Sequence, residues 1–172
     1  MRWAAIVLFA TMTAACCPAI QFPIKDLPLP GGASRQQREK AKNAVQFLYP
    51  AQVTVAAGHP AVVDLHFRAA GGLHINSHTP HDKTLIATRL AVVEEKGVEV
   101  TAVDFPPGAS YVLPFSPKEK LNVYTGDFIL RAHLTAQRGE HLLQAALRYQ
   151  ACDVNACMPP ETLPIEIGIL AK

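Results

Sequence analysis

Residues 61–69 read Ala-Val-Val-Asp-Leu-His-Phe-Arg-Ala and follow the turn residues Gly58-His59-Pro60. Within this stretch Val63, Leu65 and Phe67 alternate with charged or polar side chains. Successive side chains of a β-strand point to opposite faces. The alternation therefore predicts a strand with one face in a hydrophobic core and the other in water.

The same period-two pattern recurs from residue 45 onward, where short apolar runs alternate with turn residues and no helical stripe is evident. It predicts an all-β domain over residues 45–172. The expected architecture is an immunoglobulin-like two-sheet β-sandwich of about eight strands. The predicted strands span residues 52–57, 61–69, 73–77, 85–93, 98–105, 121–134, 142–152 and 163–170.

The composition suits one packed domain, because 49% of the 172 residues are hydrophobic and 17% are charged. The net charge of +2 is small and its basic residues are scattered, which argues against a nucleic-acid or anionic-membrane surface. No Ser-His-Asp order, phosphate loop or zinc-protease motif is present. We expect a monomer without a cofactor, and neither a hydrolase nor a nucleotide enzyme.

The N-terminal segment predicts export. A positive charge precedes residues 4–15, an apolar run too short to span a bilayer permanently. We therefore expect a signal peptide over residues 1–19 and a location in the bacterial periplasm. Thr13-Ala14-Ala15-Cys16 is similar to the site of a lipidated cysteine, whereas Cys17-Pro18-Ala19 offers an ordinary cleavage site. An envelope lipoprotein anchored through Cys16 and a free periplasmic protein both remain open.

Residues 20–44 are expected to form a linker, because several prolines and the pair Gly31-Gly32 favour an extended chain. Ser34 and Gln37 match a capping box, and residues 35–43 are good helix formers. Every face of that helix would be polar, so it is predicted to be marginal on its own. We include it in the linker.

Residues 149–162 read Tyr-Gln-Ala-Cys-Asp-Val-Asn-Ala-Cys-Met-Pro-Pro-Glu-Thr and contain Cys152 and Cys157. The strand phase places Cys152 on the polar face of strand 142–152. A hairpin loop at 153–156 would set the cysteines opposite each other, with Cα atoms roughly 4.5–5.5 Å apart and within disulfide range. The two prolines after Cys157 cannot donate backbone hydrogen bonds, so this cysteine is expected at a sheet rim.

The residues alone leave three roles open for this pair. Most exported cysteine pairs are structural, so the spacing alone slightly favours a disulfide that staples the loop. A ring this small restrains the unfolded chain little, which favours a redox pair. Cys152, Cys157 and Met158 also form a soft-sulfur set suited to Cu(I). No basic residue adjoins the cysteines in sequence, and Asp153 would raise a neighbouring thiol pKa.

A second polar cluster suggests a metal site less strongly. Alternation along residues 73–78 places His74, Asn76 and His78 on one face of a strand, with His81 just beyond. Histidines on an exposed strand are common without ligation. We therefore interpret these residues as a polar face and expect no bound metal.

The motifs around the cysteines resemble a known family. Tyr149-Gln150-x-Cys152 and Cys157-x-Pro159-Pro160-Glu161-Thr162 are similar to the motifs that bracket the active cysteines of the N-terminal periplasmic domain of the thiol:disulfide interchange protein DsbD. Residues 72–77 and 113–117 match further regions of that domain. The similarity covers roughly residues 45–170, and the family fold is an immunoglobulin-like sandwich.

The resemblance implies that Cys152 and Cys157 shuttle between dithiol and disulfide as an oxidoreductase-like electron carrier. The partners would be thioredoxin-fold redox proteins acting in trans, and Cys157 would form the mixed disulfide. It also implies that Phe115 caps the thiols; the alternative is that Phe115 only fills the end of the hydrophobic core. The positions of His74, Asn76 and Tyr149 are carried over as residues that flank the thiols or contact the partner.

The chain departs from the founding member of the family in three respects. The spacer between the cysteines is one residue shorter, and Met158 replaces an aromatic residue. The membrane and thioredoxin domains of that protein have no counterpart in this sequence, so we expect the electron donor to be a separate protein.

Overall fold

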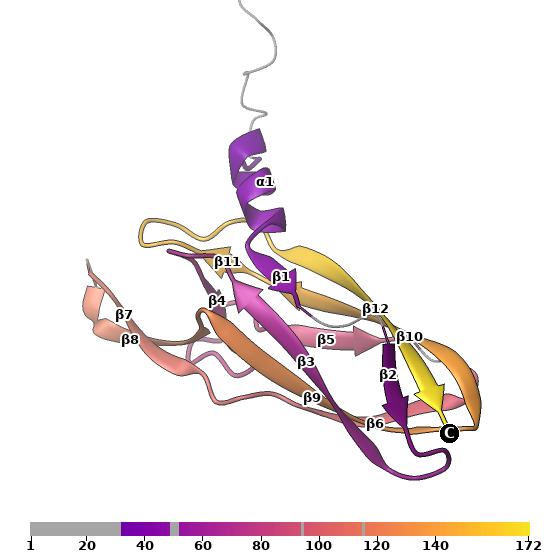
Figure 1. Ribbon diagram of the computed structural model, residues 1–172. Helices are drawn as coiled ribbons and strands as arrows, with labels where there is room; N and C mark the ends of the chain where they lie inside the picture. Colours follow the sequence, from indigo (N-terminus) through magenta and orange to yellow (C-terminus); the bar gives the residue numbers. More distant parts are fainter. Residues whose placement is uncertain (1–31, 49–51, 94, 115) are drawn as a thin grey trace, which may run out of the picture.

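The computed structural model describes residues 32–48, 52–93, 95–114 and 116–172 of the chain. Almost all regular structure in these ranges is β, which confirms the predicted fold class (Figure 1). The elements are α1 (Arg35–Lys42), β1 (Val45–Phe47), β2 (Gln52–Val55), β3 (Ala61–Ala69), β4 (His74–Asn76), β5 (Arg89–Val92), β6 (Val98–Asp104), β7 (Ala109–Leu113), β8 (Ser116–Tyr124), β9 (Asp127–Ala136), β10 (Gly139–Tyr149), β11 (Ala151–Cys152) and β12 (Glu161–Ala171).

Two four-stranded sheets form the sandwich, with strand orders β1-β3-β9-β6 and β2-β12-β10-β5. The stretch that predicts the fold behaves as expected, because Val63, Leu65 and Phe67 of β3 are all at most 1% exposed. The inward residues of β9, β10 and β12 join them in one hydrophobic cluster. Burial of one such large apolar side chain contributes about 1.5–3 kcal/mol, so this alternation accounts for much of the stability.

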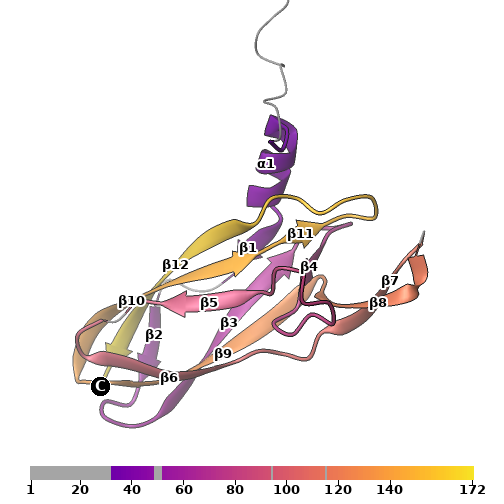
Figure 2. The ribbon, with the colours of Figure 1, turned by 180° about the vertical axis from the view of Figure 1, so that it is seen from behind.

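A third sheet, with the order β11-β4-β8-β7, extends from one end of the sandwich. Figures 1 and 2 show its β7–β8 hairpin projecting from the body. The sequence did not predict β7. Residues 121–134 were predicted as one strand, but the chain turns at Thr125-Gly126, where Gly126 has a φ of 58°, and this turn separates β8 from β9. Left-handed backbone of this kind favours glycine.

The strand predicted over 142–152 is also divided. β10 ends at Tyr149, and Gln150 lies between β10 and β11. β10 pairs with β12 and β5, whereas β11 pairs with β4 in the third sheet. The chain thus passes from one sheet to another two residues before Cys152. An alternation counted along the whole segment therefore assigns Cys152 the wrong surroundings.

The polar segment expected within the linker contains helix α1. The predicted capping box is confirmed, with the Ser34 hydroxyl accepting from Gln37 N and the Gln37 side chain accepting from Ser34 N. Ala41 and Ala44 are fully buried, and the Tyr149 hydroxyl donates to Ala41 O at 2.9 Å. These tertiary contacts stabilise a helix that its own sequence leaves marginal.

Within the residues that the structure describes, no helix combines the length and apolar character needed to cross a membrane.

We expect Tyr149→Phe to weaken the docking of α1. Burial, with Glu161 nearby, raises the pKa of Tyr149 to about 12, so its hydroxyl stays a donor to Ala41 O and Lys42 O throughout the neutral range. Loss of these hydrogen bonds should lower the free energy of unfolding by about 1–2 kcal/mol. Trypsin cleavage within α1, at Arg35, Arg38, Lys40 or Lys42, should accelerate in limited proteolysis.

Tyr124→Phe is the matched control, because the Tyr124 hydroxyl donates to Pro106 O and has no contact with α1 among the hydrogen bonds described. It should cost comparable stability but leave the cleavage of α1 unchanged. Equal cleavage rates in the two variants would contradict the docking role of Tyr149.

Candidate functional site

A short hairpin loop brings the two cysteines together. Cys152 and Cys157 occupy opposite positions of an antiparallel β-bridge and are joined by a disulfide, with Cα atoms 3.9 Å apart. Asp153 N donates to Ala156 O at 3.0 Å, and Met158 N donates to Ala151 O at 2.8 Å. The predicted hairpin loop and local pairing are therefore confirmed, but the Cα separation of 3.9 Å is shorter than the predicted range.

The two cysteines differ in exposure. Cys152 is 3% exposed, because β11 lies against β4, whereas Cys157 is exposed in the segment before Pro159 and Pro160. Those prolines precede β12 and lie outside regular pairing, as predicted. The expectation that Cys152 shares a solvent-facing polar side is wrong, because the chain changes sheets at Gln150. An external group can reach the residue at Cys157 much more readily than at Cys152.

The Asp153 side chain forms an ion pair and hydrogen bonds that hold the loop in place. Its carboxylate accepts from Lys40 Nζ of α1 at 2.6 Å and from the backbone N–H groups of Asn155 and Ala156 at 2.9 and 3.0 Å. These contacts lower the pKa of Asp153 to about 2, and the Lys40 hydrogen bond is the largest cause. The loop beside the disulfide is thereby ordered by charge-assisted hydrogen bonds.

His74 lies directly opposite Cys152 in the β4–β11 ladder. Its side chain is 2% exposed, and its ring lies 4.4 Å from the ring of Tyr111 between centroids. Burial lowers the pKa of His74, and the nearby Asp153 carboxylate opposes that shift in part. The predicted position beside the thiols agrees with this register. The prediction that His74 lies on an exposed polar face is wrong, because β11 and Tyr111 cover the His74 side chain.

Asn76 and Tyr149 are both buried, at 1% exposure each. Asn76 Nδ2 donates to Ile86 O and to Gln150 Oε1, while the Tyr149 hydroxyl is committed to α1. Neither side chain offers a partner much surface in this conformation. Phe115 and Cys16, predicted as the cap and as a lipidation site, lie outside the described residues.

The three residues considered as copper ligands, Cys152, Cys157 and Met158, differ in their exposure to solvent. Met158 is 4% exposed and belongs to the hydrophobic core cluster, unlike the exposed Cys157 beside it. A three-sulfur site would require Met158 to leave that core. His78 contacts Thr88 O and the ring of Phe105, and His81 contacts Lys120 O. Among the described residues, no group of three or more His, Cys, Asp or Glu side chains could hold a metal ion.

Two hollows border the cysteine loop. One, of about 360 Å³, lies between α1 and the loop and is lined by residues that include Lys40, Asp153 and Ala156. The other, of about 300 Å³, is lined by residues that include His74, Tyr111 and Val154. Val154 is an apolar loop residue with 43% exposure. The loop therefore stands between two recesses with its apolar side chain outward.

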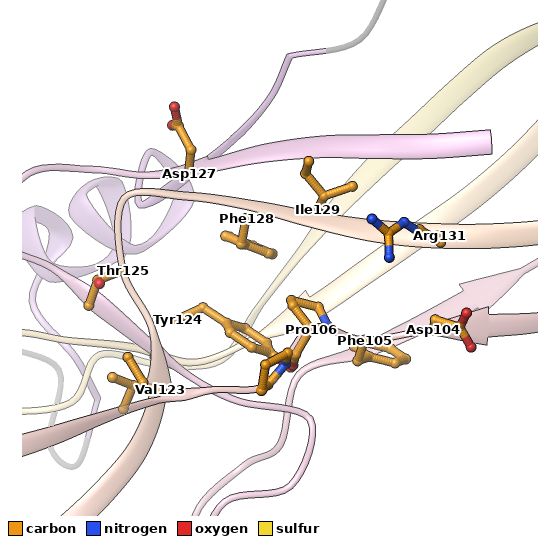
Figure 3. Close-up of a pocket in the computed structure, with 12 residues that line it drawn as sticks. Asp104, Phe105, Pro106, Val123, Tyr124, Thr125, Asp127, Phe128, Ile129 and Arg131 are labelled. Atoms are coloured by element: carbon orange, nitrogen blue, oxygen red, sulfur yellow. The ribbon is translucent and has the colours of Figure 1, made fainter. Parts of the chain in front are cut away.

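Another hollow, of about 570 Å³, lies elsewhere (Figure 3). Its lining includes Tyr124, Phe128 and Arg131, and none of the residues described as lining it is a cysteine. The Tyr124 hydroxyl inside it donates to Pro106 O at 3.0 Å. We assign this hollow no part in thiol chemistry.

Sequence reasoning missed Tyr111 and Lys40, which contact His74 and Asp153. Tyr111 and Lys40 are both distant from the cysteines in the sequence, so the neighbours of the cysteines in the chain do not reveal them. The alternation around His74 could have suggested a buried partner, but strand pairing was needed to identify Cys152 as its neighbour.

Fold and site together define a β-sandwich domain with a local disulfide at one end. Comparison with protein families matches residues 44–167 to the family described as "Thiol:disulfide interchange protein DsbD, N-terminal". The chain belongs to this family, as its motifs predicted. A search of curated protein sequences gives no match.

Three solved structures are among those similar to the chain. The reduced N-terminal domain of DsbD from Neisseria meningitidis has 18% identity and a TM-score of 0.38, over 60% of this chain and 74% of that one. The N-terminal periplasmic domain of ScsB from Proteus mirabilis has 13% identity and a TM-score of 0.46, over 72% and 46%. A PapD-like domain of human CEP192 has 10% identity and a TM-score of 0.37, and the match covers 88% of this chain and 97% of that one.

We expect Asp153→Asn to lower the melting temperature in a pH-dependent way. The folded pKa of Asp153, about 2, is below its ordinary value of 3.8, so the ionised carboxylate stabilises the fold. That contribution is fully present above about pH 4 and is lost as the pH falls through about 2. The difference in melting temperature between wild type and variant should therefore shrink from pH 7 to pH 2.

Lys40→Gln removes the partner charge and should reproduce part of the same pH-dependent loss. A difference between wild type and Asp153→Asn that stays constant from pH 7 to pH 2 would contradict this role of the carboxylate.

Proposed function

We propose that this protein is a thiol-disulfide exchange module that carries two electrons between thioredoxin-fold proteins through Cys152 and Cys157. The observation that carries the proposal is the disulfide between one exposed and one buried cysteine, in a chain of the DsbD N-terminal family. Exchange needs one sulfur that a partner can reach and a second that resolves the mixed disulfide. The exposed Cys157 suits the first role and the buried Cys152 suits the second.

In the electron-accepting half, a thiolate of the partner attacks Cys157 Sγ. The Cys152–Cys157 bond breaks, and its electron pair remains on Cys152 Sγ, which becomes a thiol when it is protonated. The partner's second thiolate then attacks its own sulfur in the mixed disulfide and releases Cys157 as a thiolate. The partner dithiol has become a disulfide, and this protein has gained two electrons and, after protonation, two protons.

We infer that the partner is a thioredoxin-fold protein acting in trans and that it approaches over the cysteine loop. The exposed Val154 offers an apolar contact beside Cys157, and the neighbouring recesses leave room for an extended segment of a partner. We infer further that Phe115 covers the thiols between encounters. The hairpin strands β7 and β8, which flank Phe115 in sequence, belong to the same sheet as β11.

We also propose that the domain works in the bacterial periplasm, either free or as a lipoprotein anchored through Cys16. The signal-like N-terminus supports export, and a disulfide persists most readily outside the cytoplasm. Mass spectrometry of the mature protein from its native host should distinguish an acylated Cys16 from a cleaved, unmodified N-terminus.

The decisive experiment uses the two single-cysteine variants. Cys152→Ala leaves the exposed Cys157 free, and it should capture a thioredoxin-fold partner whose active cysteine has been activated with thionitrobenzoate. The covalent adduct should appear on non-reducing gels and in mass spectra. Cys157→Ala leaves only the buried Cys152 and should form the adduct at least about tenfold more slowly, because access limits exchange.

The wild-type protein provides the control for a purely structural disulfide. Its Cys152–Cys157 bond should be reduced by a thioredoxin-fold dithiol, with transfer of the disulfide to that partner. Absence of an adduct with Cys152→Ala, together with a wild-type disulfide that resists this reduction, would refute the proposed function and favour a structural staple.

A further inference from the structure

His74 is the nearest titratable neighbour that strand pairing gives to Cys152. The two residues are Cα partners in the antiparallel β4–β11 ladder, and Cys152 is in turn the bridge partner of Cys157. Side chains directly opposite each other on antiparallel strands lie on the same face, with Cβ atoms about 4.5–5.5 Å apart. The imidazole of His74 and the sulfur of Cys152 therefore occupy the same side of the third sheet.

The imidazole carries a buried nitrogen without a partner. His74 is 2% exposed, and its Nε2 atom has no hydrogen-bond partner in the disulfide form of the protein. Buried polar atoms are nearly always satisfied, so such an atom requires an explanation. A disulfide sulfur has no proton to donate, but a reduced Cys152 thiol has one. Reduction of the disulfide therefore creates a donor on the side of the sheet that carries this unpaired ring nitrogen, which accepts a proton when the ring hydrogen is on Nδ1.

The surroundings keep the His74 imidazole neutral. Burial lowers the pKa of His74, and the Asp153 carboxylate, which is held by Lys40, opposes that shift only in part. Among the described contacts, the ring of Tyr111 packs on the ring of His74, and Cys152 lies opposite His74 in the ladder. On the neighbouring strand β8, Tyr124 stands opposite Ile75 and its hydroxyl is bonded to Pro106 O. A neutral imidazole at neutral pH can accept a proton.

We propose that His74 is the general base that takes the thiol proton of Cys152 when Cys152 attacks the mixed disulfide on Cys157. This inference rests on the proposed exchange function and assigns a residue to its electron-donating half. The Cys157 thiolate first attacks one sulfur of an acceptor disulfide; the acceptor's S–S bond breaks, its electron pair stays on the acceptor's other sulfur, and Cys157 is left in the mixed disulfide. His74 then accepts the Cys152 proton, and the resulting thiolate attacks Cys157 Sγ.

The step balances. The Cys152–Cys157 bond forms as the bond from Cys157 to the partner breaks, and the electron pair leaves on the partner's sulfur. The proton on His74 returns to solvent or to that sulfur. The partner disulfide gains two electrons in total and the dithiol loses them. In the reverse direction the leaving Cys152 sulfur takes a proton through His74, which draws that proton from solvent.

The test follows the reactions of Cys157 and Cys152 as two successive kinetic phases. Reduced wild-type protein is mixed with dithiobis(nitrobenzoate), whose coloured thiol is released twice. The first release reports attack by the exposed Cys157, and the second reports resolution by Cys152. An ordinary thiol with a pKa of about 8.5 is only about 3% ionised at pH 7, so a general base has room to act there.

We expect His74→Gln to slow the second release about tenfold or more at pH 7 and to leave the first release unchanged. The difference from wild type should narrow as the pH rises, because a growing fraction of the Cys152 thiol then ionises without a base. His59→Gln is the control, because this exposed histidine lies in the turn between β2 and β3 and away from the third sheet (Figure 1). Circular dichroism establishes that each variant is folded.

A measurement on the wild-type chain covers the case in which His74→Gln does not fold. Nuclear magnetic resonance titration of the His74 ring should give a pKa that differs between the oxidised and reduced proteins, because only the reduced form has a Cys152 thiol to share a proton. An unchanged second release in folded His74→Gln, or identical titrations in both redox states, would overturn the proposal. The wild-type reaction with thioredoxin-fold partners tests the exchange function separately.

Discussion

The pairing of β11 with β4 is the constraint on which the site depends. The ladder is only two residues long, yet it buries Cys152, places His74 opposite it and sets the position from which the loop turns to Cys157. The chain can reach this pairing because it leaves β10 after Tyr149.

Helix α1 and the cysteine loop support each other. Tyr149 and the buried Ala41 and Ala44 hold the end of the helix on the domain, and Lys40 extends from that helix to Asp153. Asp153 in turn caps two N–H groups of the loop. A segment that is almost wholly polar thus orders the surroundings of the disulfide through a few contacts at one end. Cys157 stays exposed in this arrangement.

Much of the architecture could be predicted from the sequence. Alternation located β3 and the sandwich core, and the spacing of Cys152 and Cys157 predicted their local pairing. The same reasoning failed where pairing between distant strands decides the outcome. Alternation does not show that a strand has changed sheets, so it wrongly placed Cys152 on the polar face of β10, whereas the residue belongs to β11. It also did not predict β7, whose Tyr111 packs on His74.

The sequence by itself determined the class of fold, the disulfide loop and the family to which the chain belongs, because these depend on periodicity and on residues close together in the chain. Tertiary structure decided which cysteine is exposed and which histidine lies opposite the buried cysteine. It also provides the contacts that stabilise a marginal helix. Those features arise from contacts between segments as far apart as Lys40 and Asp153, or His74 and Cys152. Burial and pairing of that kind are properties of the folded chain, and local sequence cannot encode them in a readable pattern.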